Sequence, residues 1–112
     1  MTVDVENARR GLTGEQEYVG RPSPLGNPYM IGKDGTREEV IAKYEDWLVV
    51  NLGMSLDAGK PNAVTAELDR LKGLHEERGH LRLACWCSPL PCHASVIRKF
   101  ILGEPLVPLK AL

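Results

Sequence analysis

Residues 81–101 read LRLACWCSPLPCHASVIRKFI, and this stretch decides the fold. Its first six residues, LRLACW, are apolar apart from one charge, a pattern typical of a strand buried on at least one face of a sheet. The loop at residues 88–91 contains two prolines and breaks the strand. From Cys92 to Gly103 the chain predicts a helix whose buried stripe consists of Val96, Ile97, Phe100 and Ile101.

Two more helices are predicted on the N-terminal side of this strand. Thr36, with Glu39 three residues later, forms a capping box, and apolar residues then recur at helical spacing as far as Leu52. A second helix is predicted from about Asn62 to Glu77, with Gly79 as its stop. The segment between them, residues 53–61, reads as a linker.

The N-terminal part of the chain predicts strands and a long loop. Alternating Val3 and Val5, and the short apolar segment that ends at Val19, indicate two brief strands before residue 21. Residues 20–35 hold three prolines and four glycines, which exclude a regular helix. We therefore predict an α/β fold in a single small layered domain of residues 1–112. A short, partly parallel sheet is flanked by about three helices in a minimal Rossmann-like arrangement. The apolar tail at residues 103–112 is expected to pack on this domain.

Composition excludes several classes of function. The chain has 14 Lys and Arg against 15 Asp and Glu, for a net charge of -1, so it lacks the basic excess that non-specific nucleic-acid binding needs. No apolar run reaches the ~20 residues that cross a bilayer, and the N-terminus has no apolar stretch of signal-peptide length. We expect a cytoplasmic protein without a membrane partner, whose three cysteines are thiols or metal ligands.

Cys85, Cys87, Cys92 and His93 form a cluster of metal-ligand type within nine residues. A Cys3His set would be chemically complete for structural zinc. The spacing argues against it, because adjacent residues at the start of a helix point about 100° apart, so Cys92 and His93 would need an unusual backbone to share one ion. No metal or other cofactor is favoured, and zinc is kept as the alternative.

The preferred interpretation places Cys92 and His93 at a helix N-terminus. Unpaired N–H groups and the helix dipole favour anions there and lower the pKa of a thiol. A strand, a tight loop and a helix also hold anionic groups at the carboxyl end of a sheet, where Cys87 would line the same site. A third interpretation stays open, since buried cysteines and a lone histidine are often ordinary structural residues. Trp86, which alternates with Cys85 and Cys87, is expected to pack against a helix.

The proline-rich loop at residues 21–28, RPSPLGNP, is predicted to face the cysteine cluster across the same crevice. Arg21 offers a planar fork for a phosphate or carboxylate, Ser23 and Asn27 offer hydrogen bonds, and Gly26 permits close backbone approach. A rigid structural loop with Arg21 paired to a surface carboxylate explains the pattern equally well. Two loops that each open onto a helix start favour a small anionic ligand.

Three blocks of the sequence resemble a known family. The blocks are GRPSPLGNPY, DGTREEVIAKYEDWL and LACWCSPLPCHASVI. They occur in the order found in a family of small bacterial and phage proteins known as domain of unknown function 4326. The resemblance covers roughly residues 18–102 and implies no activity. The last block is also similar to that of another uncharacterised α/β family, which has Cys-x-Glu-x4-Cys-His-Arg. There Glu replaces Cys87, which favours a ligand pocket over an all-cysteine zinc site.

We expect a protein that binds a small anionic molecule, a nucleotide or nucleoside derivative, and that has Cys/His-dependent transfer or hydrolysis chemistry. The ligand would be bound by Arg21, Ser23, Gly26, Asn27 and Cys87. The catalytic residues would be Cys92 and His93. Whether the protein is an enzyme stays open. The alternative is a non-catalytic interaction module with a structural zinc on the four cluster residues, such as a phage modulator of a host protein.

Overall fold

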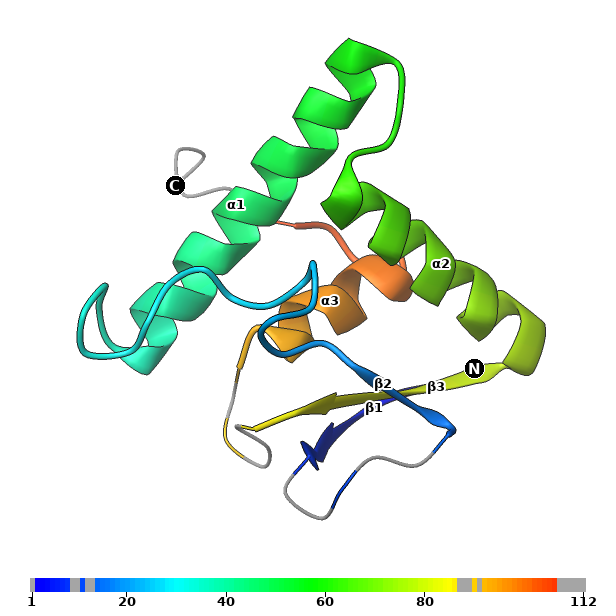
Figure 1. Ribbon diagram of the computed structural model, residues 1–112, viewed down its shortest axis with the longest axis horizontal. Coiled ribbons are helices and arrows are strands. Elements are labelled where there is room, and N and C mark those ends of the chain that lie inside the picture. Colours follow the sequence, from blue (N-terminus) through cyan, green and yellow to red (C-terminus); the bar gives the residue numbers. More distant parts are fainter. Residues whose placement is uncertain (1, 9–10, 12–13, 87–89, 91, 107–112) are drawn as a thin grey trace.

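The computed structural model describes residues 2–8, 11, 14–86, 90 and 92–106 and has the predicted α/β class. Three strands and three helices are formed by these residues (Figure 1). In chain order they are β1 (Thr2–Asn7), β2 (Gln16–Tyr18), α1 (Arg37–Ala58), α2 (Ala63–Arg78), β3 (His80–Cys85) and α3 (Ala94–Ile101).

The sheet has the order β1-β3-β2, and each strand pairing among the described residues is parallel. Thr2 pairs with His80 and Asn7 with Cys85, while Tyr18 pairs with Ala84. The strand that precedes the cysteine cluster is therefore central. Helices α1, α2 and α3 lie on the same side of the sheet, and the carboxyl ends of the strands point toward the start of α1 (Figure 1).

Helix α1 begins where the capping box predicts it. The hydroxyl of Thr36 accepts from the amide of Glu39, and the Glu39 carboxylate accepts from the amide of Thr36. Its end is later than expected, because the helix continues to Ala58 through most of the predicted linker. Gly53 did not stop the helix, since one interior glycine costs only about 1 kcal/mol. The true stop is Gly59, in the left-handed conformation with φ 68°.

The other two helices follow the predicted boundaries closely. Asn62 caps α2 through a hydrogen bond from the amide of Thr65, and Gly79 ends it at φ 78°. Helix α3 begins at Ala94, directly after His93, which occupies the N-cap position. The helix ends before Gly103. Cys92 and His93 therefore immediately precede α3.

One hydrophobic core lies between the sheet and the three helices. Tyr44 is fully buried in it, and its hydroxyl donates to the backbone carbonyl of Leu25 at 2.8 Å. That bond fastens the proline-rich loop to α1. Burial raises the pKa of the Tyr44 phenol, so the hydroxyl keeps its proton. The core is completed by Val3, Val19, Leu48, Leu68, Leu71, Leu81, Leu83 and Ile97, among others.

Two expectations lie partly outside the described residues. Leu106 of the C-terminal tail packs against the core, but residues 107–112 are not described. Cys87 is not described either. Among the helices that are described, none is long and apolar enough to cross a membrane.

Candidate functional site

The candidate site is a cavity at the edge of the sheet where β2 and β3 end. The amide of Val19 donates to the carbonyl of Ala84 at 3.0 Å, which holds the residues after β2 beside those after β3. An open cavity of about 260 Å³ lies there, between the strand ends and the first turns of α1. Its wall is formed by residues from four segments of the chain: 20–31, 37–41, 85–86 and 92–93.

Two arginines line this cavity, Arg21 from the proline-rich loop and Arg37 from the first turn of α1. Among the described residues of the cavity wall, none is Asp or Glu. The positive charge of Arg21 also lowers the pKa of His93, which places the guanidinium within electrostatic reach of the imidazole. The guanidinium of Arg21 therefore gives the wall a positive charge that suits an anionic group.

The proline-rich loop reaches the cavity because it turns tightly at Arg21. The amide of Ser23 donates to the carbonyl of Gly20, and the amide of Gly26 donates to that of Ser23. A side chain at Gly26 would place its Cβ 2.9 Å from the Cα of Arg21, a contact that only glycine avoids. Gly26 thus shapes the loop that carries Arg21.

Ser23 and Gly26, both predicted to bind ligand, do not belong to the cavity wall. The hydroxyl of Ser23 is buried and has no hydrogen-bond partner among the described residues. Asn27 does line the cavity, but both ends of its side-chain amide already form hydrogen bonds within the protein. Its Nδ2 donates to the carbonyl of Val40 at 3.4 Å, and its Oδ1 accepts from the amide of Tyr29 at 2.9 Å. Asn27 anchors the loop to α1.

Cys85 and Cys92 form the floor of the cavity with His93. The two sulfur atoms lie 3.0 Å apart, and their residues are 1% and 5% exposed. Cys85 ends the central strand, while Cys92 precedes α3. The end of the central strand and the residues before α3 therefore bring together two thiols that residues 86–91 separate along the chain.

His93 is held in a fixed orientation. Its Nε2 lies 2.7 Å from the backbone carbonyl of Val19, and its ring stands edge-on to that of Tyr44, with 5.0 Å between the centroids. A neutral imidazole with Nε2–H donating to this carbonyl has Nδ1 as its proton acceptor. Burial lowers the pKa of His93, the bond to Val19 partly offsets this, and the charge of Arg21 lowers it further. The ring is therefore neutral at pH 7 and can act as a base through Nδ1.

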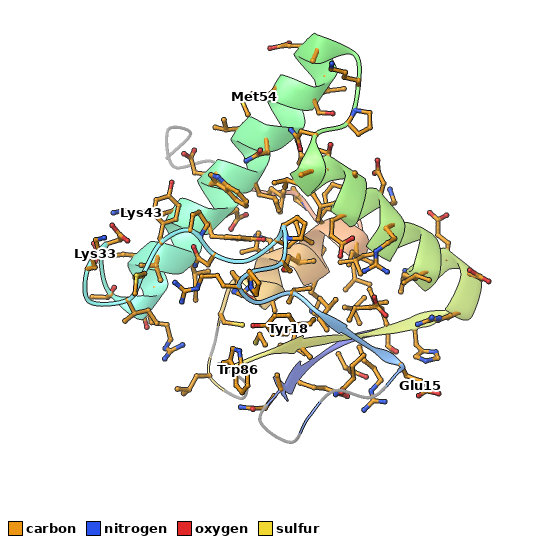
Figure 2. The ribbon with its side chains drawn as sticks, viewed as in Figure 1. Glu15, Tyr18, Lys33, Lys43, Met54 and Trp86 are labelled. Carbon is orange, nitrogen blue, oxygen red and sulfur yellow. The ribbon has the colours of Figure 1, made fainter. Side chains whose placement is uncertain are left out.

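Aromatic and aliphatic side chains surround the mouth of the cavity. Trp86 was expected to pack against a helix, and this is wrong: it is 56% exposed. Its indole N–H donates to the hydroxyl of Tyr18 at 2.9 Å, and Figure 2 shows the two side chains together at the strand ends. Tyr29, with the ammonium of Lys43 5.9 Å from its ring centre, also belongs to the wall, as do Met30, Ile31, Val40 and Ile41.

The structure thus brings four of the predicted site residues to one cavity: Arg21, Asn27, Cys92 and His93. Arg37, Tyr29 and Trp86 were not predicted to belong to it. A signal for Arg37 was present, because Thr36 marks the start of a helix beside the loop and Arg37 is its first residue.

Among the described residues, no group of three His, Cys, Asp or Glu side chains is placed to hold a metal. The zinc hypothesis includes Cys87, which lies outside them.

Comparison with known proteins identifies the family. The model of the domain of unknown function DUF4326 matches residues 5–103, a region that begins before the resemblance seen in the sequence blocks and includes the second half of β1. No curated protein and no solved structure matches the chain. Because the match takes in each of the strands and helices at least in part, together with the whole cavity wall, the chain belongs to the DUF4326 family.

Proposed function

We propose that this protein binds a small anionic molecule, a nucleotide or nucleoside derivative, in the cavity at the carboxyl edge of the sheet. The observation that supports it best is the guanidinium of Arg21 in a cavity wall whose described members include no acidic residue. A guanidinium is the side chain best suited to the planar, bidentate recognition of phosphate or carboxylate.

The aromatic and aliphatic members of the same wall favour a flat apolar group in the same ligand. Trp86 is exposed, Tyr29 belongs to the same wall, and Met30 and Ile31 are about half exposed. Bases stack on aromatic side chains with about 1–3 kcal/mol per base. Of the small anionic molecules, those that carry a nucleobase or a similar ring would use both the guanidinium and the aromatic side chains of this cavity.

The proposal includes transfer or hydrolysis chemistry at the floor. Cys92 would be the nucleophile, and the neutral His93 would accept a proton at Nδ1. Support comes from the position of both side chains in the wall and from the bond to Val19 that fixes the imidazole. Incubation with each bound nucleotide, followed by product analysis by mass spectrometry, tests this step. Product formation that persists in Cys92→Ala would contradict it.

Binding is tested by thermal shift with nucleoside monophosphates and diphosphates, the matching nucleosides, and inorganic phosphate. A ligand that binds only the folded state raises the melting temperature. We expect the phosphorylated compounds to raise it most, and Arg21→Ala to remove the difference between nucleotide and nucleoside. If no compound in the panel shifts the melting temperature, or if Arg21→Ala leaves the shifts unchanged, the proposal fails.

A structural zinc site is the second candidate, favoured by the contact between Cys85 and Cys92, whose sulfur atoms would have to separate from 3.0 Å to about 3.8 Å to share one tetrahedral zinc ion. In that case the protein would be a non-catalytic interaction module, with Cys87 and His93 completing the ligand set, and would suit a phage modulator of a host protein. Elemental analysis after dialysis separates the two candidates. One tightly held zinc per chain, lost together with the fold on chelation, would replace the ligand-pocket proposal.

A further inference from the structure

Cys85 and Cys92 are in contact, although residues 86–91 lie between them in the sequence. Cys85 is the last residue of the central strand and Cys92 lies just before α3, so both positions are tied to regular secondary structure. Buried cysteines commonly behave as small hydrophobic residues. This pair differs because both members line a cavity that is open to solvent.

From this contact we propose that Cys85 and Cys92 are a redox pair, which closes to a disulfide when a small peroxide enters the cavity. A disulfide needs about 2.0 Å between the sulfur atoms, so they would have to approach by only about 1 Å from their present 3.0 Å. Such a modification site goes beyond the binding of an anionic ligand and does not require it.

A peroxide would oxidise the two thiols to a disulfide in two steps. Cys92 is the more exposed of the two and reacts first. Its thiolate attacks the O–O bond of a peroxide ROOH and becomes a sulfenic acid. The departing oxygen takes up the proton that the thiol lost and leaves as ROH. The thiol of Cys85 then attacks that sulfur, and the sulfenic oxygen leaves as water with the proton of Cys85. Two thiols lose two protons and two electrons, and the peroxide takes up both and is reduced to an alcohol and water.

Oxidation would also regulate the cavity. Because both sulfur atoms belong to its floor, a covalent bond between them changes the surface on which a ligand rests. This consequence rests on the proposed function, whereas the oxidation itself is measured without any ligand.

The sharpest test uses Cys87→Ser, which leaves only Cys85 and Cys92. Trypsin places both in one peptide, residues 83–98, because no Lys or Arg lies between Arg82 and Arg98. After brief treatment with a stoichiometric amount of hydrogen peroxide, we expect this peptide to lose the mass of two hydrogens and to resist iodoacetamide, and dithiothreitol should reverse both changes. In Cys85→Ser/Cys87→Ser, a sulfenic acid at Cys92 should instead react with dimedone.

Wild-type protein supplies a measurement that does not depend on any variant folding. After the same oxidation, iodoacetamide should label Cys87 alone, and chymotryptic cleavage after Trp86 should leave the Cys85 peptide joined to the Cys92 peptide. Labelling of Cys85 or Cys92 in the oxidised sample would overturn the proposal. The proposal would also be overturned if the masses show oxygen added to Cys85 or Cys92 and no loss of two hydrogens. Neither result would affect the nucleotide-binding proposal.

Discussion

The imidazole of His93 is joined to the backbone of Val19 by a hydrogen bond of 2.7 Å, which connects the start of α3 to the end of β2. Two segments that are distant in the sequence thereby hold the floor of the cavity together. The same bond fixes the tautomer of the ring, so the fold and the proposed chemistry depend on one contact.

The pH dependence of stability follows from the pKa of His93. Burial lowers this pKa below the ordinary value of 6.5 in the folded state, so the unfolded chain takes up a proton first as pH falls. The free energy of unfolding should therefore decrease as pH drops below about 6.5, and it should level off below the folded pKa. Urea denaturation at pH 7.5, 6.5 and 5.5 measures this. His93→Gln should reduce the decrease, whereas His80→Gln, at an exposed position, should not.

Arg21→Ala should lower the affinity for a phosphorylated ligand about 10- to 100-fold, the loss expected for one charge-assisted hydrogen bond. The matched control is Arg78→Ala, an exposed arginine in the last turn of α2, which should leave affinity unchanged. A readout without ligand is also available. Arg21→Ala should raise the pKa of His93 in an NMR titration, since the guanidinium lowers it. An unchanged pKa would mean that the arginine is remote from the ring.

Gly26→Ala should destabilise the protein by about 1–3 kcal/mol, because the new Cβ meets backbone atoms of Arg21 and the loop must move. Gly73→Ala is the control. Nothing lies within 4 Å of a Cβ at that position inside α2, so the substitution should stabilise the helix by about 0.5–1 kcal/mol. Chemical denaturation measures both. Equal effects at the two positions would show that the loop tolerates a side chain.

Trp86 should report ligand binding by fluorescence. The chain has two tryptophans, so Trp47→Phe leaves Trp86 as the sole emitter at the mouth of the cavity. Binding of a nucleotide that stacks there should change its emission in a saturable way. The complementary variant Trp86→Phe retains Trp47, which packs partly buried against the core and should not respond. A response from Trp47 alone would place the ligand elsewhere.

Much of the fold could be predicted because its signals are local. Thr36 and Asn62 cap their helices through their own side chains, and Gly79 ends α2 in the conformation that favours glycine. The end of α1 could not be predicted in this way. Gly53 and Gly59 look alike in the sequence, and only the second has the left-handed backbone that stops a helix.

The meeting of the proline-rich loop with Cys92 and His93 was predictable from the rule that parallel strands present their carboxyl ends at one edge. The roles of individual side chains were not. Asn27 was expected to bind ligand, yet its amide is used by Val40 and Tyr29, partners that only the folded backbone supplies. Trp86 is exposed although it directly follows Cys85, the buried last residue of β3.

The pairing of the sheet also has a consequence for synthesis on the ribosome. Within the described sheet, β1 and β2 both take β3 as their neighbour, and Thr2 pairs with His80. A nascent chain that has not yet reached residue 85 therefore has two N-terminal strands with no partner, and the cavity has no floor. Neither the sheet nor the site can be assembled gradually during translation, so both must appear in one late step after β3 has left the exit tunnel.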